Sequence, residues 1–147
     1  VDAEDVSDRS DEAANKINYT ALPGKVEAEA YTSMSGIQLE DCSDTGGGKD
    51  VGHFDTDDFI EFKVSVATAG NFTIDYRLAT ANGSTGFEVL IDGVKVDGMA
   101  VPNTGGWQSW KTYTSPSFAL TAGNHTLRFK SIGKEWNINY FEVKAAN

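Results

Sequence analysis

The chain has 147 residues, of which 39% are hydrophobic, and its 12 basic and 22 acidic residues give a formal net charge of −10. This length suffices for one domain with a sizeable core, and the acidic balance argues against nucleic-acid binding, because phosphate backbones require a basic surface. The apolar runs are also too short for a membrane-spanning helix, so we expect neither nucleic acid nor a membrane as a partner.

The first 24 residues are polar and acidic, show hardly any apolar periodicity and end in Ala21-Leu22-Pro23-Gly24. This composition is typical of a solvated linker or tail. We therefore divide the chain into a linker at 1–24, which would follow an upstream domain, and a folded module at 25–147.

From residue 25 onward, apolar and polar residues alternate in short runs, as they do in half-buried strands. The Asp92-Gly93 pair between two such runs predicts a two-residue hairpin turn of type I′. No segment has a sustained 3.6-residue period, so we predict an all-β fold, a β-sandwich or jelly roll. The alternating apolar positions include Ile60, Phe62, Val64 and Val66, then Phe72, Ile74, Tyr76 and Leu78, then Phe87, Val89 and Ile91.

The gap between Asp41 and Asp57 consists mainly of turn residues, so we predict a loop there rather than a strand. Loops on a rigid sandwich are where binding sites are usually found. The gap holds Cys42, the single cysteine of the chain. A lone cysteine excludes an internal disulfide and a cysteine-based zinc cluster, and we expect Cys42 to be a small buried hydrophobe.

Two tryptophans, Trp107 and Trp110, follow a Thr-Gly-Gly turn. Residues three apart on a strand point to opposite faces, so one indole should face the core and the other solvent. Trp107 is nearer the glycines, so we predict that Trp107 is exposed and Trp110 buried. An exposed Trp at such a junction suits a binding platform, whereas the alternative is that both indoles pack under loops.

Three aspartates, Asp55, Asp57 and Asp58, lie close to His53 and are the only candidates for glycosidase-type catalysis. Aspartates crowded into one loop are more often turn formers or cation ligands, and the sequence contains no G-x-S-x-G nucleophile motif. We therefore predict a protein that is not an enzyme. His125 follows a turn, and we expect it on the surface without a role.

Glu27 and Glu29 alternate with apolar residues, so both carboxylates should share one face of the first strand. Two such carboxylates, without Cys or His nearby, suit a hard cation such as Ca²⁺. On spacing alone, a solvated strand face explains them equally well.

Six blocks follow one another in the chain: Glu27-Ala28-Glu29-Ala30-Tyr31, Asp50-Val51-Gly52-His53-Phe54-Asp55-Thr56-Asp57-Asp58-Phe59-Ile60, Tyr76-Arg77-Leu78-Ala79, Thr104-Gly105-Gly106-Trp107-Gln108-Ser109-Trp110, Leu120-Thr121-Ala122-Gly123 and Trp136-Asn137-Ile138-Asn139-Tyr140-Phe141. In this order they resemble the signature blocks of the family 6 carbohydrate-binding modules. The resemblance covers residues 25–144 and implies a jelly-roll sandwich with a structural Ca²⁺ and a sugar site in the loops at one edge.

The resemblance assigns the family's exposed sugar-stacking Trp to Trp107 and its polar Asn anchor to Asn137. Its second aromatic, often a Tyr, corresponds here to His53, which offers a smaller platform; Phe54 or Trp136 are candidates for the missing face. The implied Ca²⁺ ligands are Glu27, Glu29 and Asn139, where the family has a carboxylate, with backbone carbonyls of residues 43–48.

The resemblance further implies a secreted, monomeric, non-catalytic module that targets an attached glycoside hydrolase to a polysaccharide. We expect β-1,3-glucan of the laminarin type as the ligand, with agar, xylan or mixed-linkage glucan as alternatives. A structural or protein-interaction sandwich, with the tryptophans in an interface, is the competing hypothesis from another class.

Overall fold

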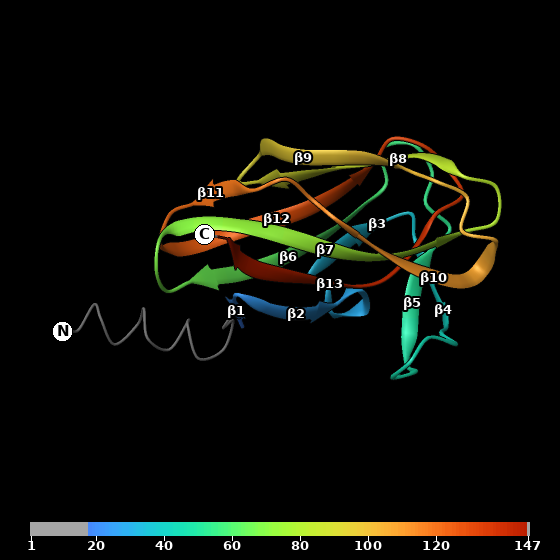
Figure 1. Ribbon diagram of the computed structural model, residues 1–147, viewed down its shortest axis with the longest axis horizontal. Helices are drawn as coiled ribbons and strands as arrows, with labels where there is room; N and C mark the ends of the chain where they lie inside the picture. Colours follow the sequence, from blue (N-terminus) through green and yellow to red (C-terminus); the bar gives the residue numbers. More distant parts are fainter. Residues whose placement is uncertain (1–17, 147) are drawn as a thin grey trace.

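The computed structural model describes residues 18–146, which form two β-sheets packed face to face (Figure 1). Nearly all neighbouring strands are antiparallel; β1 and β6 run parallel. The prediction of an all-β sandwich of the jelly-roll type is confirmed. The first sheet has the order β1 (Thr20–Leu22), β6 (Phe59–Val66), β12 (Gly123–Ser131), β8 (Ser84–Ile91), β9 (Val94–Val101), with β3 (Ser33–Ser35) on β6. The second has the order β10 (Gly106–Thr114), β7 (Gly70–Thr80), β13 (Asn137–Ala146), β5 (Lys49–Gly52), β4 (Gln38–Asp41), with β11 (Phe118–Leu120) on β7 and β2 (Gly24–Glu27) on β13.

The core lies between the sheets and consists of the alternating apolar side chains that the sequence predicts. Along β6, Ile60, Phe62, Val64 and Val66 are buried while their neighbours are partly exposed. Each such aliphatic or aromatic side chain contributes roughly 1.5–3 kcal/mol when fully buried. Edge-to-face and tilted ring contacts connect Phe62, Tyr76, Phe87, Phe129, Trp136 and Phe141.

The predicted hairpin at Asp92-Gly93 is present, because Ile91 of β8 pairs directly with Val94 of β9. Both turn residues have positive φ, 51° and 84°, as a type I′ turn requires. Asp and Gly tolerate this conformation better than most residues, which explains why the pair marks the turn in the sequence.

Two predicted boundaries differ from the structure. The first sheet begins at Thr20, ahead of the boundary predicted at residue 25, because Leu22 is buried in the core and β1 pairs with β6. A single buried position such as Leu22 produces no periodicity, so the sequence pattern could not indicate strand β1. The remainder of the predicted linker, residues 1–17, lies outside the described residues.

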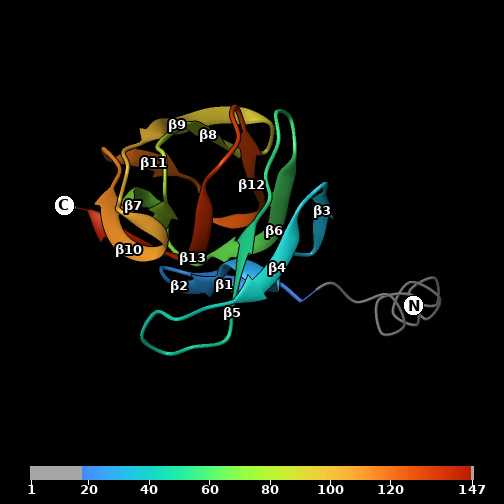
Figure 2. The same ribbon diagram turned by 90° about the vertical axis from the view of Figure 1, so that its right-hand side faces the viewer.

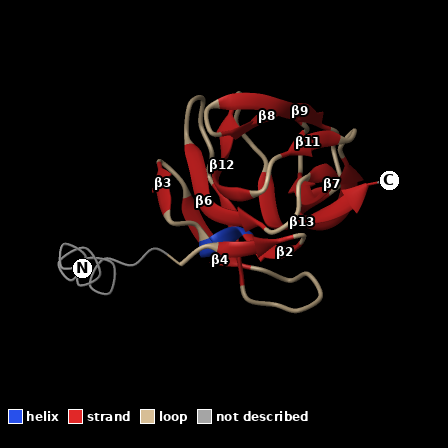
Figure 3. Cartoon of the chain, turned by 90° about the vertical axis from the view of Figure 1, so that its left-hand side faces the viewer, coloured by secondary structure: helices blue, strands red, loops and turns tan. Residues whose placement is uncertain are grey.

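The gap predicted to be a loop contains strand β5. Asp50, Val51 and Gly52 are all buried, so β5 lacks the alternation by which strands are recognised. It forms a hairpin with β4 that projects from one end of the sandwich, next to the start of β10 (Figure 2). The only helix among the described residues is a single 3₁₀ turn, η1 (Ala28–Ala30). It is drawn in blue in Figure 3, which shows the other end of the sandwich. No helix of the described part is long and apolar enough to cross a membrane.

Candidate functional site

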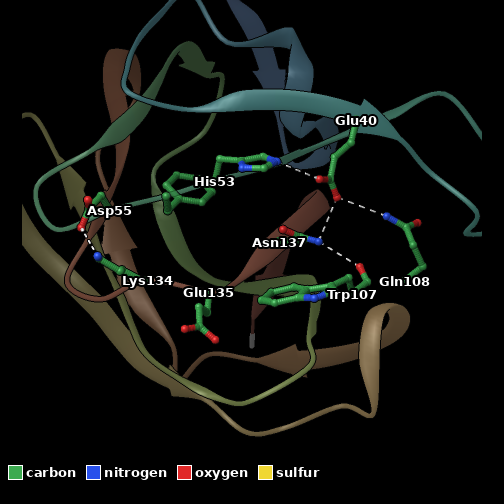
Figure 4. A pocket seen from close by; sticks show the side chains of 9 residues that line it. Glu40, His53, Asp55, Trp107, Gln108, Lys134, Glu135 and Asn137 are labelled. Atoms are coloured by element: carbon green, nitrogen blue, oxygen red, sulfur yellow. Dashed lines mark hydrogen bonds and ion pairs between the residues drawn. The ribbon is translucent and has the colours of Figure 1, made fainter.

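A cleft of about 670 Å³ opens at the end of the sandwich where the β4–β5 hairpin, the start of β10 and the turn before β13 meet. Figure 4 shows its side chains. Aromatic rings lie among polar and charged side chains, so the cleft can offer both an apolar surface and directional hydrogen-bond partners. The lining residues are Glu40, His53, Phe54, Asp55, Trp107, Gln108, Lys134, Glu135 and Asn137.

Trp107 is 42% exposed at the start of β10 and presents its indole to the cleft. The prediction of an exposed Trp107 is thus confirmed. The prediction of a buried Trp110 is wrong, because Trp110 is only half-buried and is not part of the core. Its Nε1 donates to Oε1 of Gln108 at 3.3 Å, on the edge strand of the second sheet.

Asn137, at the first position of β13, lies between Trp107 and His53 (Figure 4). Its Nδ2 donates to the backbone carbonyl of Trp107 at 2.9 Å and to Oε1 of Glu40 at 3.1 Å. Both amide hydrogens are therefore used within the protein, which fixes the amide and leaves Oδ1 as an acceptor. A side chain at Gly52 would collide with this oxygen, so glycine is required beside it.

His53 lies on the opposite side of the cleft from Trp107, with its side chain 55% exposed (Figure 4). Its Nε2 lies 3.3 Å from Oε2 of Glu40. The residue has a φ of 62°, which orients the ring across the cleft and which histidine adopts more readily than most side chains. The structure thus brings together three of the predicted residues, Trp107, Asn137 and His53.

Phe54 and Trp136 were candidates for a second aromatic face, and the structure separates them. Trp136 is completely buried, its Nε1 donates to Ser131 Oγ at 3.1 Å, and it does not line the cleft. Its prediction as a sugar-binding residue is wrong, because side chains alternate along the chain and Asn137 takes the side that faces the cleft. Phe54 does line the cleft but is only 3% exposed, since its ring stacks on Trp136 at 3.9 Å between centroids.

Glu40 connects these groups and was not identified from the sequence. One carboxylate oxygen accepts from Asn137 and the other faces His53. Gln108 donates its Nε2 to Glu40 Oε1 at 3.3 Å and to Asp50 Oδ2 at 3.0 Å. Burial raises the pKa of Asp50 to about 7, and the adjacent Glu40 carboxylate acts in the same direction. A lone Glu before a turn-rich gap gives no sequence signal for such a role.

Asp55, Asp57 and Asp58, the acidic cluster near His53, form turns, as we predicted in preference to a catalytic role. Asp58 accepts the backbone N–H of Asp55 at 2.8 Å, and Asp55 accepts that of Thr56 at 2.8 Å. Asp57 has a φ of 72°. Asp55 also lies 3.9 Å from Lys134 at the mouth of the cleft, an exposed pair of little energetic weight.

Cys42 is buried, as predicted, and burial raises the pKa of its thiol to about 11, so the thiol stays neutral. The prediction for His125 is wrong: its side chain is only 9% exposed and connects two turns. Nδ1 lies 2.6 Å from Asp92 Oδ2 and Nε2 lies 2.8 Å from the carbonyl of Thr121. Asp92 lies 33 positions away in the sequence, so the local pattern could not indicate that contact.

The expected cation ligands are arranged differently from the prediction. Glu27 ends β2 and lies 3.3 Å from Lys25, whereas Glu29 belongs to η1, so the two carboxylates do not share a strand face. The chain leaves the sheet after Glu27 because Ala28 turns into the core. Among residues 18–146, no three His, Cys, Asp or Glu side chains form a metal cluster.

Two buried oxygens nevertheless fit a hard cation, because Glu29 Oε1 and Asn139 Oδ1 have no hydrogen-bond partner. The other carboxylate oxygen of Glu29 faces the backbone N–H of Lys49 at 3.4 Å. Asn139 Nδ2 donates to Asp44 at 3.0 Å. Both side chains thus face the loop of residues 42–48, whose carbonyls could supply further oxygens.

The two-layer sandwich and the aromatic, amide-anchored cleft at its end are those of a carbohydrate-binding module rather than of an enzyme. The chain belongs to the family described as Carbohydrate binding module (family 6), whose model matches residues 27–145. It is a non-catalytic binding domain of that family.

Solved structures and curated proteins both resemble the chain over most of its length. A family 6 module of Cellvibrio mixtus lichenase 5A, solved with cellotriose, is 34% identical, with 85% of this chain and 98% of that chain covered and a TM-score of 0.76. The C-terminal family 6 module of LamC, a laminarinase of Zobellia galactanivorans, is 32% identical, with 82% and 97% covered and a TM-score of 0.76. Clotting factor G alpha subunit of Tachypleus tridentatus is 33% identical over 121 residues, or 80% of this chain, which spans only 18% of that protein.

Proposed function

We propose that the cleft between Trp107 and His53 binds a polysaccharide, β-1,3-glucan of the laminarin type. The observation that carries this proposal is the exposed indole of Trp107 opposite His53, with the oriented amide of Asn137 between them. A pyranose ring presents a face of C–H groups that stacks on an aromatic ring, while its hydroxyls need directional partners. Asn137 Oδ1 and the Glu40 carboxylate supply acceptors for those hydroxyls.

The preference for β-1,3-glucan rests on the relatives. One similar module belongs to a laminarinase, and another, from Bacillus halodurans, is described as β-1,3-glucan binding and is 29% identical with a TM-score of 0.79. Agar and xylan stay as alternatives, because beta-agarase AgaA of Microbulbifer thermotolerans is 29% identical over 101 residues and a Clostridium cellulolyticum module, 27% identical, was solved with xylose.

We further propose that the module is secreted and holds an attached glycoside hydrolase on its substrate. A tethered binder raises the effective concentration of the enzyme at the polysaccharide without taking part in the chemistry. A structural Ca²⁺, held by Glu29, Asn139 and carbonyls of the 42–48 loop, would fasten that loop to the sheet.

The test is a calorimetric titration of the module with laminarin-derived, agarose-derived and xylan-derived oligosaccharides. Binding of laminari-oligosaccharides alone supports the proposal, whereas binding of another glycan keeps the cleft and changes the ligand. Absence of binding to all three by a folded sample would favour a protein-interaction surface around Trp107.

A further inference from the structure

Glu135, in the turn before β13, lines the cleft and has an unusual backbone conformation. Four residues other than glycine have positive φ in the described part of the chain, and two of them, Asp57 and Asp92, are aspartates in turns. The other two, His53 and Glu135, both line the cleft. Asn, Asp and His are enriched in this conformation but glutamate is not, so the φ of 72° at Glu135 carries a steric cost. Such strain is typically retained at functional sites.

Two hydrogen bonds from the end of β7 and the turn after it hold Glu135 in place. The hydroxyl of Thr80, a buried residue, donates to the backbone carbonyl of Glu135 at 2.5 Å. Nδ2 of Asn82 donates to Oε1 of Glu135 at 2.6 Å. The Thr80 hydroxyl also accepts the N–H of Gly83 at 3.0 Å, so one buried group holds both turns. The strained backbone and the carboxylate of Glu135 are thus both fixed by the β7 side of the cleft.

The charge of Glu135 is the least compensated among the three carboxylates that line the cleft. Nε2 of His53 lies 3.3 Å from Glu40, and this pair is partly exposed. Nζ of Lys134 lies 3.9 Å from Asp55. Glu135 instead meets a neutral amide, and in the described part of the chain no cationic side chain pairs with it and no donor reaches its Oε2. The carboxylate is therefore oriented, and one of its oxygens is left to accept from a ligand.

Glu135 also has the right place for contact with a bound sugar. Figure 4 shows it on the Trp107 side of the cleft, across from His53. A pyranose ring that stacks on the indole of Trp107 directs its hydroxyls outward around its rim, where they need directional partners. A carboxylate beside the platform is such a partner, in addition to the amide of Asn137.

We propose that Glu135 is a second polar anchor for the glycan and restricts the cleft to neutral glycans, with Asn82 as its positioning residue. This inference rests on the proposed function of the cleft. The free oxygen of Glu135 accepts a sugar hydroxyl, and hydrogen bonds to an ionised acceptor are about twice as strong as neutral ones. The same charge repels a sulfate or uronate group on the sugar, because no cation beside it offsets the repulsion.

Glu135→Gln is the diagnostic variant, because glutamine keeps the shape and can accept from Asn82 but carries no charge. In calorimetry, affinity for laminarihexaose should fall about fivefold, and affinity for a sulfated laminarihexaose should rise about fivefold. The matched control is Glu88→Gln, the same change in the ion pair with Lys95 on the other sheet, which should bind both ligands as the parent does. Agarohexaose and xylohexaose, each with its sulfated form, serve as parallel probes.

Salt separates the charge of the sulfate from its bulk. Repulsion between exposed charges is screened at about 0.5 M NaCl, so salt should raise the affinity of the parent for the sulfated ligand and narrow its difference from Glu135→Gln. If the sulfated ligand stays equally weak at both salt concentrations, its bulk excludes it, and the charge selection by Glu135 is overturned.

A double-mutant cycle tests the positioning role of Asn82, which is exposed, as is Glu135. Asn82→Ala should lower laminarihexaose affinity about threefold in the parent and leave it unchanged in the Glu135→Ala background, because Asn82 acts through that carboxylate. An equal loss in both backgrounds would show that Asn82 supports the fold in general, and it would overturn the positioning role. Thermal unfolding of each variant verifies that it is folded.

Trp107→Ala distinguishes this inference from the proposed function. If Trp107→Ala loses binding while Glu135→Gln matches the parent with every probe, the cleft binds glycan and the role of Glu135 is overturned. A parent that prefers the sulfated ligands likewise overturns the inference and keeps the cleft as a glycan site. A folded parent that binds none of the probes overturns both.

Discussion

Arg77 in the middle of β7 binds Asp44 of the β4–β5 loop with two parallel hydrogen bonds, Nε to Oδ2 at 2.8 Å and Nη2 to Oδ1 at 2.9 Å. Asn139 of β13 donates to the same carboxylate at 3.0 Å. Hydrogen bonds from Arg77 and Asn139 lower the pKa of Asp44 to about 2. A loop with three successive glycines, residues 46–48, is thereby fastened to the middle of the second sheet.

Replacing Asp44 with alanine should destabilise the module by about 2–4 kcal/mol, because it leaves a partly buried guanidinium without its carboxylate. Because the pKa of Asp44 is lowered, this residue contributes fully to the free energy of unfolding above about pH 4. The contribution is lost as the pH falls toward 2. Urea unfolding at pH 7 and pH 2.5 measures both effects. Glu88→Ala, at the more exposed ion pair with Lys95, should cost under about 1 kcal/mol; equal costs for the two variants would contradict the assignment.

Trp107→Ala should abolish most glycan binding while leaving stability almost unchanged. The exposed indole contributes little to the core, but a central aromatic platform is typically worth at least about 2 kcal/mol of binding, or about 30-fold in Kd. Calorimetry with laminarihexaose and thermal unfolding test the two parts. Val94→Ala, at an exposed hydrophobic residue on the β8–β9 turn, is the control and should change neither. Unaltered affinity in the Trp107 variant would place the site elsewhere.

The strands of the core and the exposure of Trp107 are local properties, which is why the sequence predicts them. Alternation marks β6 and β7 because one face of each is buried, and Asp92-Gly93 marks its turn through its own backbone preferences. Strand β5 is different, since the burial of Asp50 depends on Glu40 and Gln108, which other strands supply. Residues 49–52 show no alternation by which this strand could be recognised.

The centre of the cleft depends on contacts between distant residues. Gln108 and Glu40 are 68 positions apart, and their contact exists only because β4, β5 and β10 meet at one end of the sandwich. Family resemblance supplied Asn137 and His53, but it left Trp136 as a candidate for the second aromatic face. Trp136 packs in the core instead, against Phe87, and this contact could not be read from the local sequence.

His53→Gly should separate binding from stability. At a φ of 62° glycine removes the steric cost that a side chain carries, so we expect stability to stay equal or rise by up to about 1 kcal/mol. The same change removes the ring opposite Trp107 and the partner of Glu40, so glycan affinity should fall about tenfold. Urea unfolding and calorimetry measure the two quantities on one preparation. A variant that binds at parental strength would show that His53 only borders the site.

His125 should make stability depend on pH. Hydrogen bonds to Asp92 and to the carbonyl of Thr121 raise the pKa of His125. A raised pKa means that this stabilisation is complete below the unfolded-state pKa of about 6.5 and is lost as the pH rises through the higher folded-state value. Urea midpoints from pH 5 to 9 should fall in that window for the parent and stay level for His125→Ala. An identical decline in both proteins would assign the effect to another group.

Asn139→Asp tests the proposed Ca²⁺ site, because it adds a carboxylate where the amide oxygen has no partner. In the parent, Asn139 donates a hydrogen bond to Asp44. In the variant without calcium, the new carboxylate faces Asp44 instead, so the variant should melt below the parent in EDTA. With calcium the added charge should strengthen binding about tenfold and raise the melting temperature above that of the parent. Magnesium, which requires a smaller octahedral site, is the control ion and should restore less stability. A variant that melts below the parent by the same margin in calcium and in EDTA would refute calcium binding by Asn139.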